Sequence, residues 1–314
     1  MVSDKINHKV RQIKSKKRVA DHGEVFTADR EVNAMLDLVK QETERVDSRF
    51  LEPACGDGNF LAEILRRKLE AAKKPYCIVN ADCMKVLQDL SENSVDLILT
   101  DPPYNLGLFM KNRATNLKAM RPNFFGAAGW DDLEFDAWKE SMDAMFEECA
   151  RIIKPGGSMI VFMSIIKVET IIQLATKHGF YYKTTGIWHK LNPMPRNMNL
   201  HFINSTETWI YFTYKKHTGT FNNEGKAVHD FFETAVTPAG EKKHGKHPTQ
   251  KPVALLEKFV TLLSNEGDVV LDPFMGVGSS GVAAIAHNRK FIGAELSTEY
   301  CEISERRLSE LCQI

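Results

Sequence analysis

Apolar and polar positions alternate along this chain in blocks that predict short buried strands between longer amphipathic helices. Compact runs of β-branched and aliphatic residues predict strands around residues 77–81, 95–100, 158–163, 209–213, 268–271 and 291–294. Apolar positions at helical spacing predict helices over Phe135–Ile153, Lys167–His178, Pro252–Ser264 and Thr298–Leu311. Strands that alternate with helices indicate an α/β fold, a doubly wound and mostly parallel sheet of the Rossmann-like type.

The strand predicted at 95–100 ends abruptly in Asp101-Pro102-Pro103-Tyr104. Neither proline can donate to a sheet, so this tetrapeptide is expected at the carboxyl end of a strand, where open α/β sheets bind ligands. The Asp101 carboxylate and the Pro102 carbonyl could accept hydrogen bonds from an exocyclic amine on a base, while the Tyr104 ring offers a stacking face. This geometry suits methylation of an amino group, and a rigid turn after a strand is the alternative.

A second candidate site follows the strand predicted at 268–271. Asp272 ends this strand, and a turn with Gly276 and Gly278 leads toward a helix start. Glycines let the backbone pass close to a ligand, and Glu295 at the end of the next strand is placed to bind a ribose diol. A dinucleotide-binding fold is the usual alternative, but the turn lacks the third glycine of that fingerprint.

These motifs resemble the amino-group DNA methyltransferases that use S-adenosylmethionine, in the permuted order called the beta class. The resemblance covers about residues 76–310 and rests on six matches in order: Asn80–Cys83, Asp101–Tyr104, Ile152–Phe162, Ile187–Pro195, His247–Pro252, and 271–278 together with Glu295. In this family Asp-Pro-Pro-Tyr usually accompanies N6-adenine methylation, and Ser-Pro-Pro-Tyr accompanies N4-cytosine methylation. The resemblance therefore implies adenine as the target.

The resemblance and the motifs together give a set of expected site residues, without a metal ion. The catalytic residues would be Asp101, Pro102, Pro103 and Tyr104. The cofactor-binding residues would be Asp82, Cys83, Asp101, Thr249, Lys251, Asp272, Phe274, Gly276, Gly278, Ser279 and Glu295. The base pocket and the DNA would be contacted by Trp188, Asn192, Lys111, Arg113, Arg121, Arg196 and Lys216.

The charge distribution supports a double-stranded DNA partner. The formal net charge of the 314 residues is zero, but the segment from Lys183 to Lys251 holds ten Lys or Arg against five acids. The loop from Gly107 to Gly126 carries four basic residues and no acid. Basic segments that flank a catalytic loop fit phosphate contacts, and solvated loops on an ordinary enzyme are the alternative.

The amino-terminal residues 1–74 are expected to form an extension before a methyltransferase domain at 75–314, within which an insert at about 196–246 would recognise DNA. The extension holds a second turn of the cofactor type, with a strand before Glu52 followed by Gly56 and Gly58, and it resembles the start of unpermuted adenine DNA methyltransferases. The position that would match Glu295 is Pro75. We therefore assign the cofactor to the carboxyl-terminal motifs and interpret the first turn as a duplicated, non-functional remnant.

Composition bears on the cellular compartment and on the alternative functions. Six cysteines form no Cys-x-x-Cys pair and no apolar run reaches a membrane span, so the expectation is a cytoplasmic protein with reduced thiols and no membrane partner. C5-cytosine chemistry would need a cysteine nucleophile, normally after proline, and the chain has no Pro-Cys pair. N4-cytosine methylation and a non-catalytic DNA-binding protein with this fold stay open. In similar proteins a homodimer is common, and a restriction endonuclease acting on the same site is a candidate partner.

Overall fold

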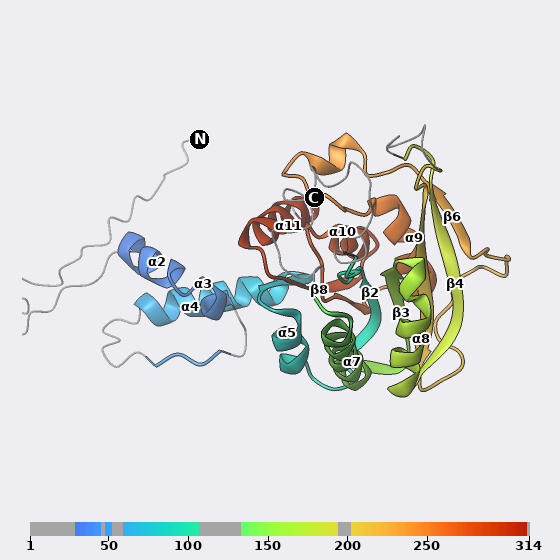
Figure 1. Ribbon diagram of the computed structural model, residues 1–314. Helices are drawn as coiled ribbons and strands as arrows, with labels where there is room; N and C mark the ends of the chain where they lie inside the picture. The colour runs from blue at the N-terminus through green and yellow to red at the C-terminus, as the bar shows by residue number, and fades with distance from the viewer. Residues whose placement is uncertain (1–28, 45–47, 52–58, 107–132, 194–201, 313–314) are drawn as a thin grey trace, which may run out of the picture. The chain divides into compact units, whose positions relative to one another are not determined.

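The computed structural model describes residues 29–44, 48–51, 59–106, 133–193 and 202–312 of the chain. The chain divides into two compact units, Met1–Lys74 and Pro75–Ile314. The first unit contains the helices α2 (Asp29–Asp37), α3 (Lys40–Glu44) and α4 (Asn59–Lys73). The second unit contains the sheet and the helices that cover it (Figure 1).

The first unit has a small apolar core of its own. Val32 and Leu36 of α2 pack with Ile64 of α4, and Phe50 and Phe60 lie against this cluster. Leu51 is 91% exposed and Leu61 is exposed as well, so neither belongs to this core.

The strand predicted before the amino-terminal glycine turn is absent from the described part of this segment. Residues 48–51 have no strand conformation, because no neighbouring strand pairs with them. The turn itself, including Glu52 and Asp57, lies outside the described residues. Its interpretation as a duplicated remnant stays a prediction.

The second unit is built on one eight-stranded sheet in the order β1-β8-β7-β2-β3-β5-β4-β6. The strands are β1 (Tyr76–Asn80), β2 (Val95–Thr100), β3 (Ile153–Met163), β4 (Phe180–Lys190), β5 (Thr206–Tyr214), β6 (Phe231–Thr234), β7 (Val269–Asp272) and β8 (Lys290–Glu295). Only β5 pairs antiparallel to its neighbours. The sheet is therefore mostly parallel, as the alternation of strands and helices predicts.

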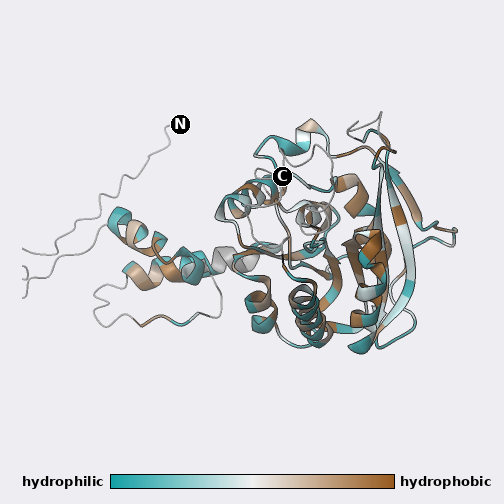
Figure 2. Ribbon diagram, in the orientation of Figure 1, coloured by the Kyte–Doolittle hydropathy of each residue, from teal (hydrophilic) through white to brown (hydrophobic). Residues whose placement is uncertain are grey.

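Helices cover both faces of this sheet. The helices α5 (Cys83–Asp89), α7 (Phe135–Ile152) and α8 (Val168–Lys177) share one apolar cluster with the sheet, and α9 (Val253–Leu263), α10 (Ser279–Ala286) and α11 (Thr298–Leu311) share a second one. Strand β2 faces both clusters, because Ile98 lies in the first and Leu97 and Leu99 lie in the second. The central strands are accordingly mostly hydrophobic (Figure 2).

All six strands predicted within residues 75–314 are present, and the sequence missed β4 and β6. Strand β4 is polar along much of its length and contains Gly186, which weakens a strand signal. A Cβ on Gly186 would lie 1.9 Å from the Trp209 ring, so the glycine lets that ring pass over the strand. Strands β5 and β6 both fall inside the segment 196–246 expected to form an insert, so DNA recognition is left to its loops and stays a prediction.

The connections from β2 and β7 leave the sheet on opposite faces. Strand β2 leads through α7 to β3, and β7 leads through α10 to β8. These two helices belong to the two different apolar clusters. The neighbours β2 and β7 thus form a topological switch point, and a crevice is expected at their carboxyl ends.

Candidate functional site

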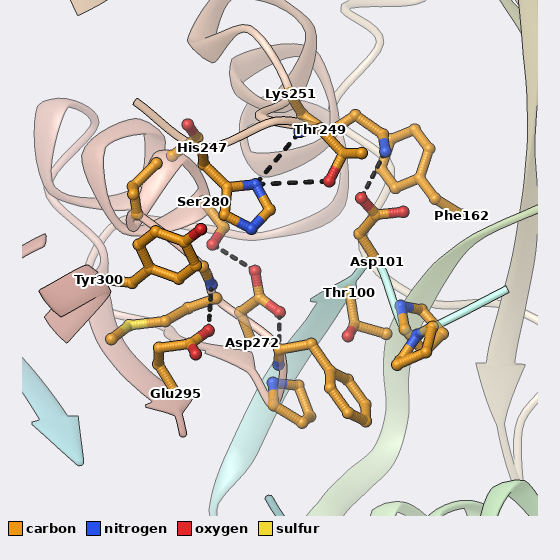
Figure 3. Close-up of a pocket in the computed structure, with 18 of the residues that line it drawn as sticks. Thr100, Asp101, Phe162, His247, Thr249, Lys251, Asp272, Ser280, Glu295 and Tyr300 are labelled. Carbon is orange, nitrogen blue, oxygen red and sulfur yellow. Dashed lines mark hydrogen bonds and ion pairs between the residues drawn. The ribbon is translucent and has the colours of Figure 1, made fainter. Parts of the chain in front are cut away.

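A cavity of about 690 Å³ lies at this switch point (Figure 3). Its size falls in the range of ligand pockets. The predicted site residues that line it are Asp82, Cys83, Asp101, Pro102, Pro103, Tyr104, Thr249, Lys251, Asp272, Phe274, Gly276, Ser279 and Glu295. The structure therefore brings together residues that are up to 213 positions apart in the chain, from Asp82 to Glu295.

The glycine turn between β7 and α10 forms one wall of the cavity. Gly276 and Gly278 adopt left-handed φ values of 54° and 73°, which favour glycine. Arg307 of α11 donates from Nη1 to the Val277 carbonyl at 2.5 Å and to Ser279 Oγ at 3.2 Å. These contacts hold the turn against α11 and leave its inner backbone facing the cavity.

Asp272 ends β7 and is buried beneath the turn. Its carboxylate accepts a hydrogen bond from Ser280 Oγ at 2.5 Å and one from the Phe274 backbone N–H at 3.1 Å. Burial raises the pKa of the Asp272 carboxyl to about 7, against an ordinary value of 3.8. The charged form of this group is therefore costly, and a cationic ligand group beside it would stabilise that charge.

This shift predicts a pH dependence of stability. A folded pKa of about 7 contributes stability that is complete below pH 3.8 and is lost as the pH rises to about 7. The side chain of the Asp272→Asn variant cannot ionise, so this variant should lack the loss. Between pH 5 and pH 8 the free energy of unfolding of the wild type should therefore fall by about 2–3 kcal/mol more than that of the variant. Urea unfolding at the two pH values measures the difference. Equal pH dependence in both proteins would contradict the burial of a titrating Asp272.

Glu295 is the last residue of β8 and lines the same cavity. Its Oε2 accepts the Gly276 N–H at 3.1 Å and its Oε1 accepts the Ser297 N–H at 2.7 Å. Burial raises the pKa of the Glu295 carboxyl. Two backbone donors fix the carboxylate, and the lone pairs left over suit a diol. Asp82, from the end of β1, caps α5 through a bond from the Met84 N–H at 2.9 Å.

The Asp101–Tyr104 motif leaves the end of β2 and lines the same cavity. The Tyr104 hydroxyl donates to Asp101 Oδ1 at 2.7 Å, and Lys251 Nζ forms an ion pair with Asp101 Oδ2. The Trp138 indole N–H donates to the Pro103 carbonyl at 3.0 Å, which fixes the motif to α7. Figure 3 shows Asp101 and Lys251 at one end of the cavity and Glu295 with Tyr300 at the other.

Sequence reasoning missed several residues of this site. Trp138 anchors the motif, and Glu207 lines the cavity beside Lys251, with Nζ to Oε2 at 3.1 Å. Glu207 is the second residue of the antiparallel strand β5, whose amino end lies beside the carboxyl ends of the parallel strands. That placement requires the strand order, and no motif in the sequence reports it.

Three residues expected at the base pocket or the DNA lie elsewhere. Trp188 does not line the cavity, because β4 turns it into the core, where it is 3% exposed and donates to Thr234 Oγ1 at 2.8 Å. Asn192 is exposed outside the cavity and accepts from the Val236 N–H at 2.8 Å.

Lys216 is the third. It follows β5, and pairs such as Ser158 with Thr213 place that end of β5 at the sheet edge opposite the catalytic motif. Lys216 therefore lies away from the cavity. The other expected contacts, Lys111, Arg113, Arg121 and Arg196, lie outside the described residues.

Neither a metal-ligand cluster nor a membrane-spanning helix occurs in the part of the chain that the structure describes. Among those residues, no three His, Cys, Asp or Glu side chains gather as metal ligands. No helix there is long and apolar enough to cross a membrane.

Comparison with known proteins defines the family. A model of the DNA methylase family, which comprises N6 and N4 methylases, matches residues 95–306. The type II methyltransferase M2.LlaDCHI of Lactococcus lactis subsp. cremoris is 32% identical over 257 residues, which cover 79% of this chain and 94% of that protein. The type II methyltransferase M.HinfI of Haemophilus influenzae is 32% identical over 249 residues, which cover 74% and 68%. The chain belongs to this family and is a DNA methyltransferase.

Solved structures agree in fold. The complex of M1.HpyAVI with S-adenosylmethionine has a TM-score of 0.57 and 29% identity, and the match covers 74% of this chain and 98% of that one. The cytosine-N4-specific PvuII DNA methyltransferase has a TM-score of 0.60 at 19% identity, over 77% and 93% of the two chains. The family takes its methyl group from S-adenosylmethionine.

The residues of the cavity fit this cofactor. Its ribose needs hydrogen-bond acceptors, and its methionine end carries both a cationic amine and a carboxylate. Glu295 offers carboxylate oxygens to a diol, buried Asp272 offers a negative charge that a cation would stabilise, and the amino end of α10 offers backbone N–H groups to a carboxylate.

Proposed function

We propose that this protein transfers the methyl group of S-adenosylmethionine to N6 of adenine in double-stranded DNA. The observation that carries the proposal is the position of Asp101, at the tip of β2 and on the wall of the cavity that also holds Asp272 and Glu295. An anionic acceptor is thus available to an amino group placed in the cavity. The Asp-Pro-Pro-Tyr motif favours adenine over cytosine.

The chemistry requires that a poor nucleophile be oriented. The lone pair of an exocyclic amine is conjugated into its ring, and acceptors that bind the two amine hydrogens favour a tetrahedral nitrogen. The Asp101 carboxylate and the Pro102 carbonyl would be these acceptors, with the base resting on Tyr104. When bound, the cofactor would supply a sulfonium methyl group, and the electrons of its S–C bond would stay on sulfur. The nitrogen lone pair would form the new N–C bond, and one amine proton would leave to water or to the Asp101 carboxylate that accepts it. Most of the acceleration then comes from positioning.

The target base must leave the duplex to reach the cavity. Flipping costs a few kcal/mol of stacking and pairing. Stacking on Tyr104 would offset about 1–3 kcal/mol of this cost. The cofactor residues would be Asp82, Cys83, Asp101, Thr249, Lys251, Asp272, Phe274, Gly276, Gly278, Ser279 and Glu295.

Sequencing of DNA from a host that expresses the protein tests the proposal. Methylated adenines at a recurring short sequence are the expected result, absent from the same host with an empty vector. N4-methylated cytosines in their place would support the alternative target. If no methylation is found, and calorimetry shows DNA binding but no cofactor binding, the non-catalytic alternative is supported.

The proposal extends to partners and location. The relatives are named type II methyltransferases, which supports a restriction endonuclease acting on the same site as a partner. We also propose that the protein is a homodimer and is located in the cytoplasm. Cleavage of unmethylated, but not methylated, host DNA by a co-encoded nuclease would test the partner, and sedimentation of the free protein would test the dimer.

Basic residues at the catalytic edge should contribute to DNA affinity through phosphate contacts. Lys246 is exposed beside His247, which lines the cavity, and Lys111 and Arg121 follow the catalytic motif in the sequence, outside the described residues. Each Lys or Arg to Ala change should lower the slope of log affinity against log salt by up to about 0.9. Lys216→Ala, at the opposite sheet edge, is the matched control and should leave the slope unchanged. If all four variants keep the wild-type slope, these charges only face solvent.

A further inference from the structure

Both oxygens of the Asp101 carboxylate are engaged in the free protein. Oδ1 accepts the Tyr104 hydroxyl at 2.7 Å, and Oδ2 is paired with Lys251 Nζ (Figure 3 shows the Lys251 pair). A base amine that comes to Asp101 must therefore compete with donors already in place. The strongest competitor is the ammonium, because hydrogen bonds between charged partners are the stronger ones.

Lys251 cannot simply turn to water. Its side chain is 8% exposed, and its ammonium lies against the Tyr104 and Phe162 rings, 5.7 Å and 5.0 Å from their centroids. A buried ammonium that loses its only anion is strongly disfavoured. Release of Asp101 thus requires a second anion within reach of the same Nζ.

Glu207 is that second anion. Its Oε2 lies 3.1 Å from Lys251 Nζ and 3.5 Å from the Tyr104 hydroxyl, so one oxygen is within reach of both donors that hold Asp101. Its Oε1 is paired with Lys190 of β4, which keeps the carboxylate oriented. The four side chains Asp101, Glu207, Lys190 and Lys251 carry two negative and two positive charges.

The protonation states agree with this geometry. Burial opposes the charge on Lys251, but Asp101 and Glu207 overcome it and raise the pKa of the Lys251 ammonium above its ordinary value. Burial also opposes the charge on Glu207, and Lys251 and Lys190 overcome it and lower the pKa of the Glu207 carboxyl. Both partners are charged near neutral pH.

We propose that Glu207 is a positioning residue that takes over the Lys251 ammonium and the Tyr104 hydroxyl when Asp101 turns to the amine of the target base. This inference rests on the proposed amino-group methylation. Glu207 acts through Lys251 and Tyr104 and does not touch the reacting nitrogen. Without it, Lys251 would stay on Asp101 and the acceptor would be weakened at the moment of transfer.

The competing explanation is purely structural. Glu207 could serve only to neutralise Lys190 and Lys251 so that the protein folds. In that case its loss would lower stability but leave the rate of transfer in the folded enzyme unchanged. The rate of a single turnover, measured with saturating cofactor and DNA, separates the two explanations.

The first experiment compares Glu207→Gln with Glu233→Gln in the full chain. Glu233 lies on the edge strand β6, is exposed and pairs with His189 of β4, so the control makes the same chemical change outside the cavity. We expect Glu207→Gln to slow single-turnover methylation about tenfold or more, with cofactor affinity by calorimetry within about threefold of the wild type. The control should match the wild type in both measurements.

Two results would overturn the inference. One is a single-turnover rate for folded Glu207→Gln within about twofold of the wild type. The other is a loss of cofactor affinity as large as the loss of rate, which would make Glu207 a cofactor residue. If wild-type protein methylates no amino group in DNA at all, the proposed function fails, and that result is distinct from a failure of Glu207 alone.

A second experiment needs no variant and decides the matter if Glu207→Gln does not fold. It is a crystal structure of the wild type with S-adenosylhomocysteine and a duplex that carries the target base. We expect Lys251 Nζ at hydrogen-bond distance from Glu207 and withdrawn from the Asp101 oxygen that accepts the amine. An unchanged Lys251–Asp101 pair beside a bound amine would overturn the inference.

Discussion

Asp101→Ala should abolish methyl transfer, with a loss of about 100-fold or more in rate, while affinity for S-adenosylmethionine stays within about tenfold. The reason is the position of the side chain, which meets the base amine at the tip of β2 while the cofactor is held by Asp272 and Glu295. Lys251 keeps Glu207 as an anionic partner at 3.1 Å in this variant, so the buried ammonium is not left alone. Transfer of labelled methyl groups to duplex DNA measures the loss.

Asp96→Ala is the matched control for this change. Asp96 lies near the other end of β2, where its carboxylate pairs with Lys154 at 2.7 Å and accepts the Val269 N–H at 2.9 Å. Its loss should lower stability without lowering the rate of the folded enzyme. Retention of more than a few per cent of activity by Asp101→Ala would remove Asp101 from the reaction.

Asp272→Ala and Glu295→Ala should each weaken cofactor binding by about 1.5–3 kcal/mol, which is about 10-fold to 150-fold, as expected for a lost hydrogen bond to a charged group. Glu295 should lose its bonds to the ribose, and Asp272 its stabilisation of a cationic group. Titration calorimetry with S-adenosylmethionine measures both losses in the absence of DNA.

The amino-terminal turn supplies the matched controls for these two variants. Glu52→Ala and Asp57→Ala change the acids of the second Gly-x-Gly segment and should leave cofactor affinity nearly unchanged. A larger loss from Glu52→Ala than from Asp272→Ala would move the cofactor to the first unit and overturn the assignment of the site.

The sequence predicts the parts of this fold that depend on local pattern. Strand β2 is a compact aliphatic run followed by Asp101 and Pro102, and β7 is one that ends at Asp272 before Pro273. Both their burial and their ends could therefore be predicted from the sequence. Eleven of the thirteen expected site residues that line the cavity lie at, or just beyond, a predicted strand end or in the glycine turn, and the other two, Thr249 and Lys251, precede a predicted helix. Parallel strands bring such ends to one edge.

The parts that depend on strand order could not be predicted. Glu207 reaches Lys251 only because β5 runs antiparallel beside β3, and the same reversal carries Lys216 to the far edge. Trp188 belongs to a motif of the family, yet the register of β4 turns its ring into the core beside Thr234. Because β4 is largely polar, its sequence does not show which of its faces is buried until the neighbouring strands are known.

The identity of the methylated nucleoside shows whether N6 of adenine is the atom that receives the methyl group. Purified protein would be incubated with duplex DNA and methyl-labelled S-adenosylmethionine, and the digested nucleosides would be separated by mass. We expect labelled N6-methyldeoxyadenosine with the wild type and none with Asp101→Ala. Labelled N4-methyldeoxycytidine, or no labelled nucleoside from a wild-type protein that binds the cofactor, would contradict the proposed function.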